Sequence, residues 1–73
     1  MKTCKLLKFF SKRLRTFRLQ KGLTQEELSF EASLARSTIA MVERQKNDIT
    51  LSKVEVLAKA LNVEVKDFFE GFD

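Results

Sequence analysis

Two short helical patterns stand back to back in residues 24–45, TQEELSFEASLARSTIAMVERQ, and they constrain this chain more than any other feature. Thr24 and Glu27 have capping-box spacing, in which the threonine oxygen accepts a backbone N–H and the glutamate accepts the N-cap N–H. This spacing predicts a helix over 25–32, and another helix follows over about 36–44. Only three or four residues separate them, so the two helices cannot fold back as an antiparallel hairpin. The stretch therefore predicts two helices that meet at a steep angle.

Hydrophobic periodicity predicts that the rest of the chain is helical as well. Residues 5–21 have an apolar face opposite a basic one, and Gly22 is expected to end this helix as a left-handed residue. Thr50 is the expected N-cap of a fourth helix over 51–62, and a short fifth helix is expected near 65–69. The apolar faces contain Leu6, Leu7, Phe10, Leu14 and Phe17 in the first helix, and Leu51, Val54, Leu57, Ala58 and Leu61 in the fourth. The sequence predicts an all-α fold: a compact bundle of about five short helices in a single domain, residues 1–73, with a core at about 5–70.

The composition excludes several kinds of site. The chain has one cysteine, Cys4, and no histidine, so it can build neither a disulfide framework nor a zinc site. Without histidine or a glycine-rich phosphate loop, it lacks the groups for acyl transfer or metal-assisted hydrolysis. No apolar run is long enough for a membrane span, although an amphipathic helix at a membrane interface is an alternative for the N-terminus. We therefore expect a cytoplasmic protein that is not an enzyme, with no cofactor, metal, small-molecule ligand or membrane.

Positive charge is concentrated at the N-terminal end of the chain. Residues 1–22 carry a net charge of +8 with no acidic residue, whereas residues 54–73 carry −3. A polyanion is a natural partner for such a cationic end. The alternative is that the basic residues only keep a small domain soluble.

The outward face of the predicted helix over 36–44 has the chemistry of a surface that contacts nucleic acid. It presents Arg36, Ser37, Ala40, Met41 and Arg44, with no carboxylate. In helix-turn-helix geometry, the first helix braces across the DNA backbone and the second projects its N-terminal end into a major groove. The fork of Arg36 matches the O6 and N7 acceptors of guanine, and Met41 can contact a thymine methyl. The alternatives are a phosphate or acidic partner for Arg36 and simple packing for Met41.

Three motifs, KGLTQEELS, STIAMVER and LAKALNVEVKDFF, together resemble the Cro/C1-type (XRE-like) helix-turn-helix family of phage repressors and restriction–modification controller proteins. The resemblance covers roughly residues 10–69 and implies a lambda-repressor-like DNA-binding domain. It implies that Gln25 holds a phosphate, and that bases are read by Arg36, Ser37, Thr38 and Met41. It also implies a structural ion pair between Arg18, near the end of the first helix, and Glu43, near the end of the third.

Contacts to the DNA backbone are expected near the starts of the second and fourth helices and in the loop between the third and fourth. Backbone N–H groups and the positive end of a helix make such places suitable for phosphate. The expected phosphate-contacting residues are Thr24, Gln25, Arg44, Lys46, Asn47, Thr50, Ser52 and Lys53. The predicted function is sequence-specific binding of double-stranded DNA by a transcriptional regulator of the repressor or controller type, acting as a homodimer on a palindromic operator.

The C-terminal aromatic residues suggest how two copies would associate. Phe68, Phe69 and Phe72 are more apolar surface than one short helix can bury, which predicts that they form the dimer interface. The alternative is that Phe68 or Phe69 caps the core of one chain while Phe72 frays. A different function is also open: exposed Phe9 and Phe30 would suit a protein-binding partner, such as the antitoxin of a toxin–antitoxin pair, with DNA binding secondary.

Overall fold

The computed structural model describes residues 4–73 as four α-helices followed by one turn of 3-10 helix, with no strand among these residues. The elements are α1 (Lys5–Gln20), α2 (Gln25–Ala32), α3 (Arg36–Glu43), α4 (Leu51–Leu61) and η1 (Val65–Phe68). The expected all-α fold is therefore confirmed, but the expected fifth helix is only the single turn η1. Within residues 4–73, no helix is both long and apolar enough to cross a membrane.

Local sequence signals begin and end the helices. Glu27 N–H donates to Thr24 Oγ1 at 3.0 Å and Thr24 N–H donates to Glu27 Oε1 at 2.8 Å, which completes the capping box of α2. Thr50 caps α4 by accepting from the backbone N–H of Lys53 at 3.3 Å. Gly22, with a φ of 72°, follows α1 in the left-handed conformation that glycine adopts without strain.

The short turn between α2 and α3 has neither a glycine at its left-handed position nor a capping side chain before α3. Ser33 adopts the left-handed conformation, with a φ of 56°, although it has a side chain. Ala35 precedes α3 without a side-chain cap. Tertiary packing therefore holds the turn, because Leu34 and Ala32 pack at the core on either side of Ser33.

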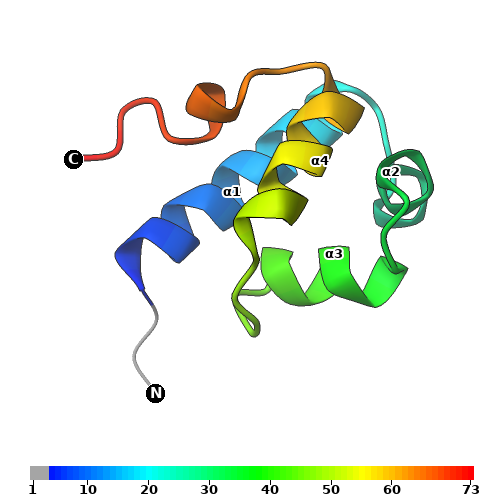
Figure 1. Cartoon of the computed structure of the whole chain (residues 1–73), viewed down its shortest axis with the longest axis horizontal. Coiled ribbons are helices and arrows are strands. Elements are labelled where there is room, and N and C mark those ends of the chain that lie inside the picture. The colour runs from blue at the N-terminus through cyan, green and yellow to red at the C-terminus, as the bar shows by residue number, and fades with distance from the viewer. Residues whose placement is uncertain (1–3) are drawn as a thin grey trace.

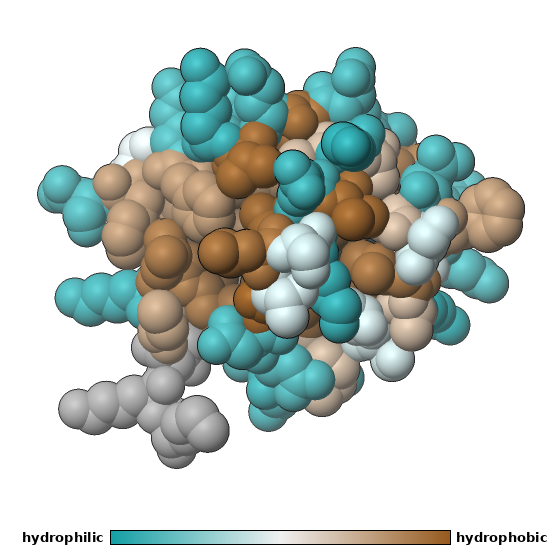
Figure 2. Space-filling model, in the orientation of Figure 1, coloured by the Kyte–Doolittle hydropathy of each residue, from teal (hydrophilic) through white to brown (hydrophobic). Residues whose placement is uncertain are grey.

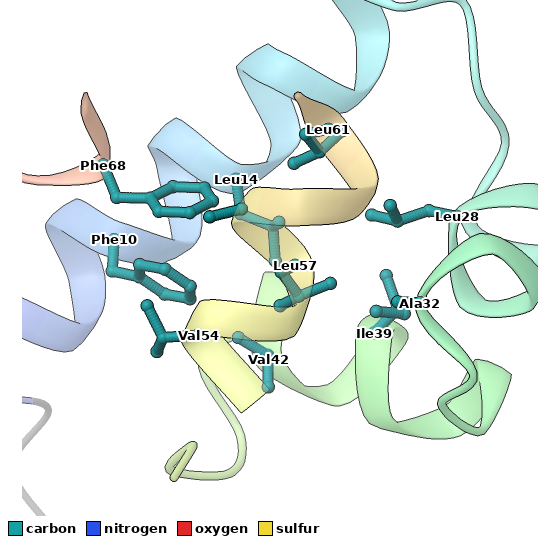
Figure 3. Close-up of a cluster of buried hydrophobic side chains, with 11 residues drawn as sticks. Phe10, Leu14, Leu28, Ala32, Ile39, Val42, Val54, Leu57, Leu61 and Phe68 are labelled. Atoms are coloured by element: carbon teal, nitrogen blue, oxygen red, sulfur yellow. The ribbon is translucent and has the colours of Figure 1, made fainter. Parts of the chain in front are cut away.

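α4 supplies the centre of the core: in Figure 3 its Leu57 lies between Phe10 and Leu14 on one side and Leu28 and Ile39 on the other, and α4 is the yellow helix of Figure 1. Leu57 and Leu61 of α4 are fully buried. The buried hydrophobic residues are Phe10 and Leu14 of α1, Leu28 and Ala32 of α2, Ile39 and Val42 of α3, Val54, Leu57, Ala58 and Leu61 of α4, and Phe68 of η1. Two residues expected on apolar faces point outward instead, since Leu6 is 42% and Leu51 85% exposed.

Arg13 fastens the C-terminal segment to α1. Its Nη1 donates to the backbone carbonyl of Asp67 at 2.8 Å, and its Nη2 donates to that of Glu70 at 2.8 Å. The guanidinium also lies 5.1 Å from the ring centroid of Phe9, and the Phe9 ring makes an edge contact with that of Phe72 at 5.4 Å. Phe9 is thus partly covered by its own chain, and its expected exposure is wrong.

Phe68 is fully buried within one chain, where its ring packs on those of Phe10 and Phe17 at 4.8 and 5.5 Å between centroids. Its assignment to a dimer interface is therefore wrong, because no surface of it remains for a second copy. Phe69 is half-buried against Phe10, with centroids 5.8 Å apart, and Phe72 is 41% exposed. These two keep some accessible surface.

Ser11 places an unsatisfied hydroxyl in the core, and its substitution by alanine is expected to stabilise the domain. Its hydroxyl is buried and has no hydrogen-bond partner among residues 4–73. Ser11→Ala removes an unsatisfied polar group and adds a better helix former, so we expect the free energy of unfolding to rise by about 1 kcal/mol. Ser29→Ala is the matched control, because the buried Ser29 hydroxyl donates to the carbonyl of Glu26 at 2.7 Å. Urea unfolding should show a gain for Ser11→Ala only; an equal gain in both variants would contradict this account.

Candidate nucleic-acid interface

α3 lies at one edge of the molecule, below α4 in the view of Figure 1, and its exposed residues are on the side turned away from the core. Ile39 and Val42 anchor the opposite side of the helix in the core. Of the residues expected to read bases, Arg36 and Ser37 are exposed, whereas Thr38 and Met41 are half-buried. All four therefore have some accessible surface, and the two nearest the N-terminal end of α3 have the most.

The residues expected to hold phosphate fall into two groups. Thr24 and Gln25 are at the start of α2, and the Thr24 oxygen already accepts the capping bond. The other group follows α3, where Gln45 turns the chain with a φ of 60°. It consists of Arg44, Lys46, Asn47, Thr50 and Ser52, which are exposed, and Lys53, which is half-buried. Polar groups thus lie at the start of the helix before α3, in the loop after α3 and in the first turn of α4.

A buried ion pair joins α1 to α3. Arg18 Nε donates to Glu43 Oε2 at 2.7 Å and Arg18 Nη2 donates to Glu43 Oε1 at 3.0 Å, which makes a bidentate pair. The side chains of Arg18 and Glu43 are only 9% and 4% exposed. Arg18 Nη1 also donates to the carbonyl of Leu23 at 2.8 Å, so the same guanidinium holds the turn before α2. The structure brings together the two residues that the family resemblance paired.

Hydrogen bonding to Glu43 raises the pKa of Arg18 above its ordinary value. Burial acts in the opposite direction by disfavouring the charged form, and the negative charge of Glu43 adds to the increase. Arg18 is therefore charged at every pH at which the domain would be studied, and its charge depends on Glu43 for compensation.

The same carboxylate also binds Gln25, a contact that the sequence did not indicate. Gln25 Nε2 donates to Glu43 Oε1 at 3.2 Å. An amide nitrogen has two protons, so this bond leaves one donor of Gln25 for another acceptor. Glu43 thus ties the start of α2 to the end of α3, and it fixes Gln25 relative to the helix that carries Arg36.

The basic side chains of α1 are largely free of acidic partners. Lys5, Lys8, Lys12 and Arg15 are all exposed. Across the described part of the chain, the ion pairs within 4.0 Å are Arg18–Glu43 and the exposed pair Lys66–Glu64. Most of the positive charge is therefore unpaired and contributes to the electrostatic field around the domain.

The sequence does not identify the stacking of Arg13, and its periodicity places Leu51 on the apolar face of the fourth helix. Arg13 was only one of many cations, although its i, i±4 spacing to Phe9 and Phe17 is a signal of stacking along a helix. Leu51 has the periodicity of the apolar face, but as the first residue of α4 it is exposed.

Comparisons with known proteins agree with this arrangement. A family model described as Helix-turn-helix matches residues 14–68. Control protein C.BamHI of Bacillus amyloliquefaciens is 37% identical over 62 residues, which are 84% of this chain and 76% of that protein. The restriction–modification controller protein C.AhdI from Aeromonas hydrophila has a similar structure, with a TM-score of 0.83 and 41% identity, over 86% of this chain and 96% of that chain.

A second controller protein, C.Esp1396I, was solved as a tetramer in complex with its natural 35 base-pair operator. Its chain matches with a TM-score of 0.85 and 36% identity, over 92% of this chain and 88% of that chain. The matched residues include α2, the turn and α3 in full. The chain therefore belongs to the Cro/C1-type (XRE-like) helix-turn-helix family, with restriction–modification controller proteins among its relatives.

Proposed function

We propose that this protein is a transcriptional regulator of the repressor or controller type that binds double-stranded DNA by sequence. The observation that carries the proposal is the geometry around α3: an outer face without carboxylates before Glu43, polar groups at the start of α2 and after α3, and Gln25 fixed to α3 through Glu43. The solved operator complex of C.Esp1396I supports the same kind of partner for this chain.

In the proposed complex, the N-terminal end of α3 enters the major groove. Arg36 binds guanine through O6 and N7, Ser37 and Thr38 supply hydroxyl contacts, and Met41 packs against a thymine methyl. Gln25 and the residues after α3 bind phosphates on either side of the groove and fix the orientation of α3. Two copies bind a palindrome, because a two-fold symmetric protein reads two inverted half-sites.

We propose no catalytic activity, because the family is one of DNA-binding regulators and the chain has no histidine to serve as a general base. The antitoxin alternative has less support. Phe30 is 83% exposed, as that alternative requires, but Phe9 packs against Phe72 and Arg13 of its own chain. A binding site formed by both rings would need the C-terminal segment to move.

Selection from a pool of random duplexes tests the proposed function. The expected result is enrichment of a palindrome whose half-site centres are one helical turn, or ~34 Å, apart. Competition with an unrelated duplex of the same length should then leave the selected complex intact. Recovery of sequences with no common motif after several rounds would contradict sequence-specific binding.

Lys46 should behave as a contact to the DNA backbone. When one phosphate contact is missing, DNA binding releases one fewer counterion. Lys46→Ala is therefore expected to reduce the slope of the logarithm of the DNA-binding constant against the logarithm of the salt concentration by about one unit per protomer. The loss of affinity should be equal on operator and scrambled duplex, because phosphates carry no base information. Lys59→Ala, which removes an exposed lysine of α4 that is not among the proposed DNA contacts, is the control and should leave the slope unchanged. A slope that Lys46→Ala does not alter would remove Lys46 from the interface.

A further inference from the structure

Four basic side chains run along the outer face of α1 and have no part in the proposed contacts to the operator. These residues, here called the basic row, are Lys5, Lys8, Lys12 and Arg15. They follow one another at spacings of three or four residues, so they lie in one line about 15 Å long. All four are exposed, and neither of the ion pairs found within residues 4–73 involves them. Residues 4–22 contain no acidic residue, so the positive charge of the row is not compensated from its own helix.

Exposure to water alone does not account for such a row. Like charges three or four positions apart repel each other, as Lys8 and Lys12 do, and this lowers the stability of the helix. Lys5 adds to the cost, because a cation in the first turn meets the positive end of the helix dipole, and α1 has no acidic residue there. Alternating lysine and glutamate would keep the domain soluble equally well, and these residues attract each other at the same spacing. A polyanion bound along the row would remove the repulsion.

The distribution of apolar surface favours a nucleic acid over a membrane as the polyanion. A helix at a membrane interface buries its apolar face in the lipid. The apolar face of α1 is instead turned into the core, where Phe10 and Leu14 are buried. On the face of the domain shown in Figure 2, apolar residues gather near the middle and hydrophilic residues surround them. The basic row consists of cations alone, which suits a partner that is charged along its whole length, as a nucleic-acid backbone is.

The basic row and the outer face of α3 point in different directions. Phe10 and Leu14 of α1 point into the same core as Ile39 of α3 (Figure 3). A helix turns by about 100° per residue, which places the row on the side of α1 opposite Phe10 and Leu14. The exposed Arg36 likewise lies on the side of α3 away from the core. An operator held by α3 therefore leaves the row open to another partner.

We propose that the basic row binds the phosphate backbone of a second segment of double-stranded DNA while α3 holds the operator. A duplex carries one negative charge per about 1.7 Å of its axis, so a length of about 15 Å presents enough phosphates for all four cations. Contacts to phosphates carry no base information, so this second contact is independent of sequence. The choice of DNA among polyanions rests on the proposed function. A regulator with such a row links its operator to another stretch of duplex.

Neutralising the middle of the row tests the proposal. In the row variant, Lys8→Gln with Lys12→Gln, glutamine keeps the helix propensity of lysine without its charge. The matched control is Lys59→Gln with Lys66→Gln, which removes the same net charge from exposed lysines of α4 and η1. The melting temperature of the free row variant should equal or exceed that of the parent, because the repulsion between the two lysines is gone. A fall of more than a degree or two would assign the row a structural role and overturn the inference.

The binding measurement is retention of a labelled scrambled duplex by protein that already occupies an immobilised operator, selected from the random pool. The parent should retain the second duplex. The row variant should bind it roughly tenfold or more weakly at about 0.1 M salt, with a slope against salt smaller by about two units per protomer. The control variant should retain it almost as the parent does. Both variants should keep the parent's preference for the operator over a scrambled duplex, because α3 is unchanged.

A parent that retains no second duplex, or a row variant that retains it as the parent does, would overturn the inference. An equal loss in the control would show that only net charge matters, with the same consequence. Vesicles of phosphatidylserine and phosphatidylcholine should not displace the second duplex, and displacement that depends on the row would assign the row to a membrane instead. The proposed function is tested separately by replacing the operator with a scrambled duplex. Linking of two scrambled duplexes by the parent but not by the row variant, without preference for any sequence, would contradict the proposed function and leave the role of the row standing.

Discussion

Replacing Glu43 with glutamine is expected to lower the free energy of unfolding by about 3–5 kcal/mol, the usual effect of removing one partner from a buried ion pair. The neutral amide no longer compensates the charge of Arg18, whose side chain is 9% exposed. Both carboxylate oxygens of Glu43 accept hydrogen bonds from Arg18 or Gln25, whereas the amide of glutamine has only one acceptor oxygen. Domains of this kind have a total stability of about 5–15 kcal/mol, so the loss approaches global unfolding.

A thermal melt measures this effect directly. At about 4–8 °C per kcal/mol for a domain of this length, the midpoint should fall by at least ~12 °C. Glu31→Gln is the control: Glu31 is an exposed glutamate of α2, and its substitution should leave the midpoint almost unchanged. The double variant Arg18→Met with Glu43→Leu should recover much of the loss, because it leaves no unpaired charge. A Glu43→Gln midpoint within a degree or two of the parent would show that the pair contributes little.

The ends of α2 and α4 are predictable because they depend on neighbouring residues. Thr24 and Glu27 form the capping box that their spacing predicts, and Thr50 caps α4 as expected. Asn62 ends α4 in the left-handed conformation, with a φ of 58°. Such signals act over one turn of chain, so a single sequence contains all the information they need.

The C-terminal segment was harder to predict because distant residues determine it. Two backbone carbonyls of this segment accept bonds from Arg13, which lies 54 and 57 positions earlier in the chain. Four residues of 3-10 helix are also too few to show a hydrophobic period, so the pattern could not decide between a dimer interface and the alternative in which Phe68 faces inward while Phe72 stays near the surface. Burial there depends on tertiary contacts.

The candidate interface shows the same division between local and long-range information. The exposed positions of Arg36 and Ser37 follow from the helical period of α3. The bond from Gln25 to Glu43 spans 18 positions and depends on how closely α2 approaches the end of α3. Leu51 has the right period for the core, but the helices around it leave it uncovered. Periodicity identifies the side of a helix that packs, and it does not identify where along the helix the neighbouring elements end.

Substitution of Arg36 can distinguish base recognition from non-specific electrostatic attraction to DNA. It is exposed near the N-terminal end of α3, the end that enters the major groove in helix-turn-helix docking. A bidentate contact from its guanidinium to guanine is worth about 1–3 kcal/mol of discrimination. Arg36→Ala is therefore expected to weaken binding to an operator that carries this guanine by about 5- to 150-fold, with a much smaller loss on other sequences.

The most direct test of sequence-specific binding through α3 is a titration of the parent and Arg36→Ala against the selected operator and a scrambled duplex, repeated over a salt series. The parent should prefer the operator at every salt concentration, and Arg36→Ala should lose most of that preference while its affinity for the scrambled duplex changes little. Arg36→Lys should not restore the preference, because an ammonium lacks the planar fork. An equal loss on both duplexes would identify Arg36 as a backbone contact, and a parent that binds both duplexes equally would contradict the proposed function itself.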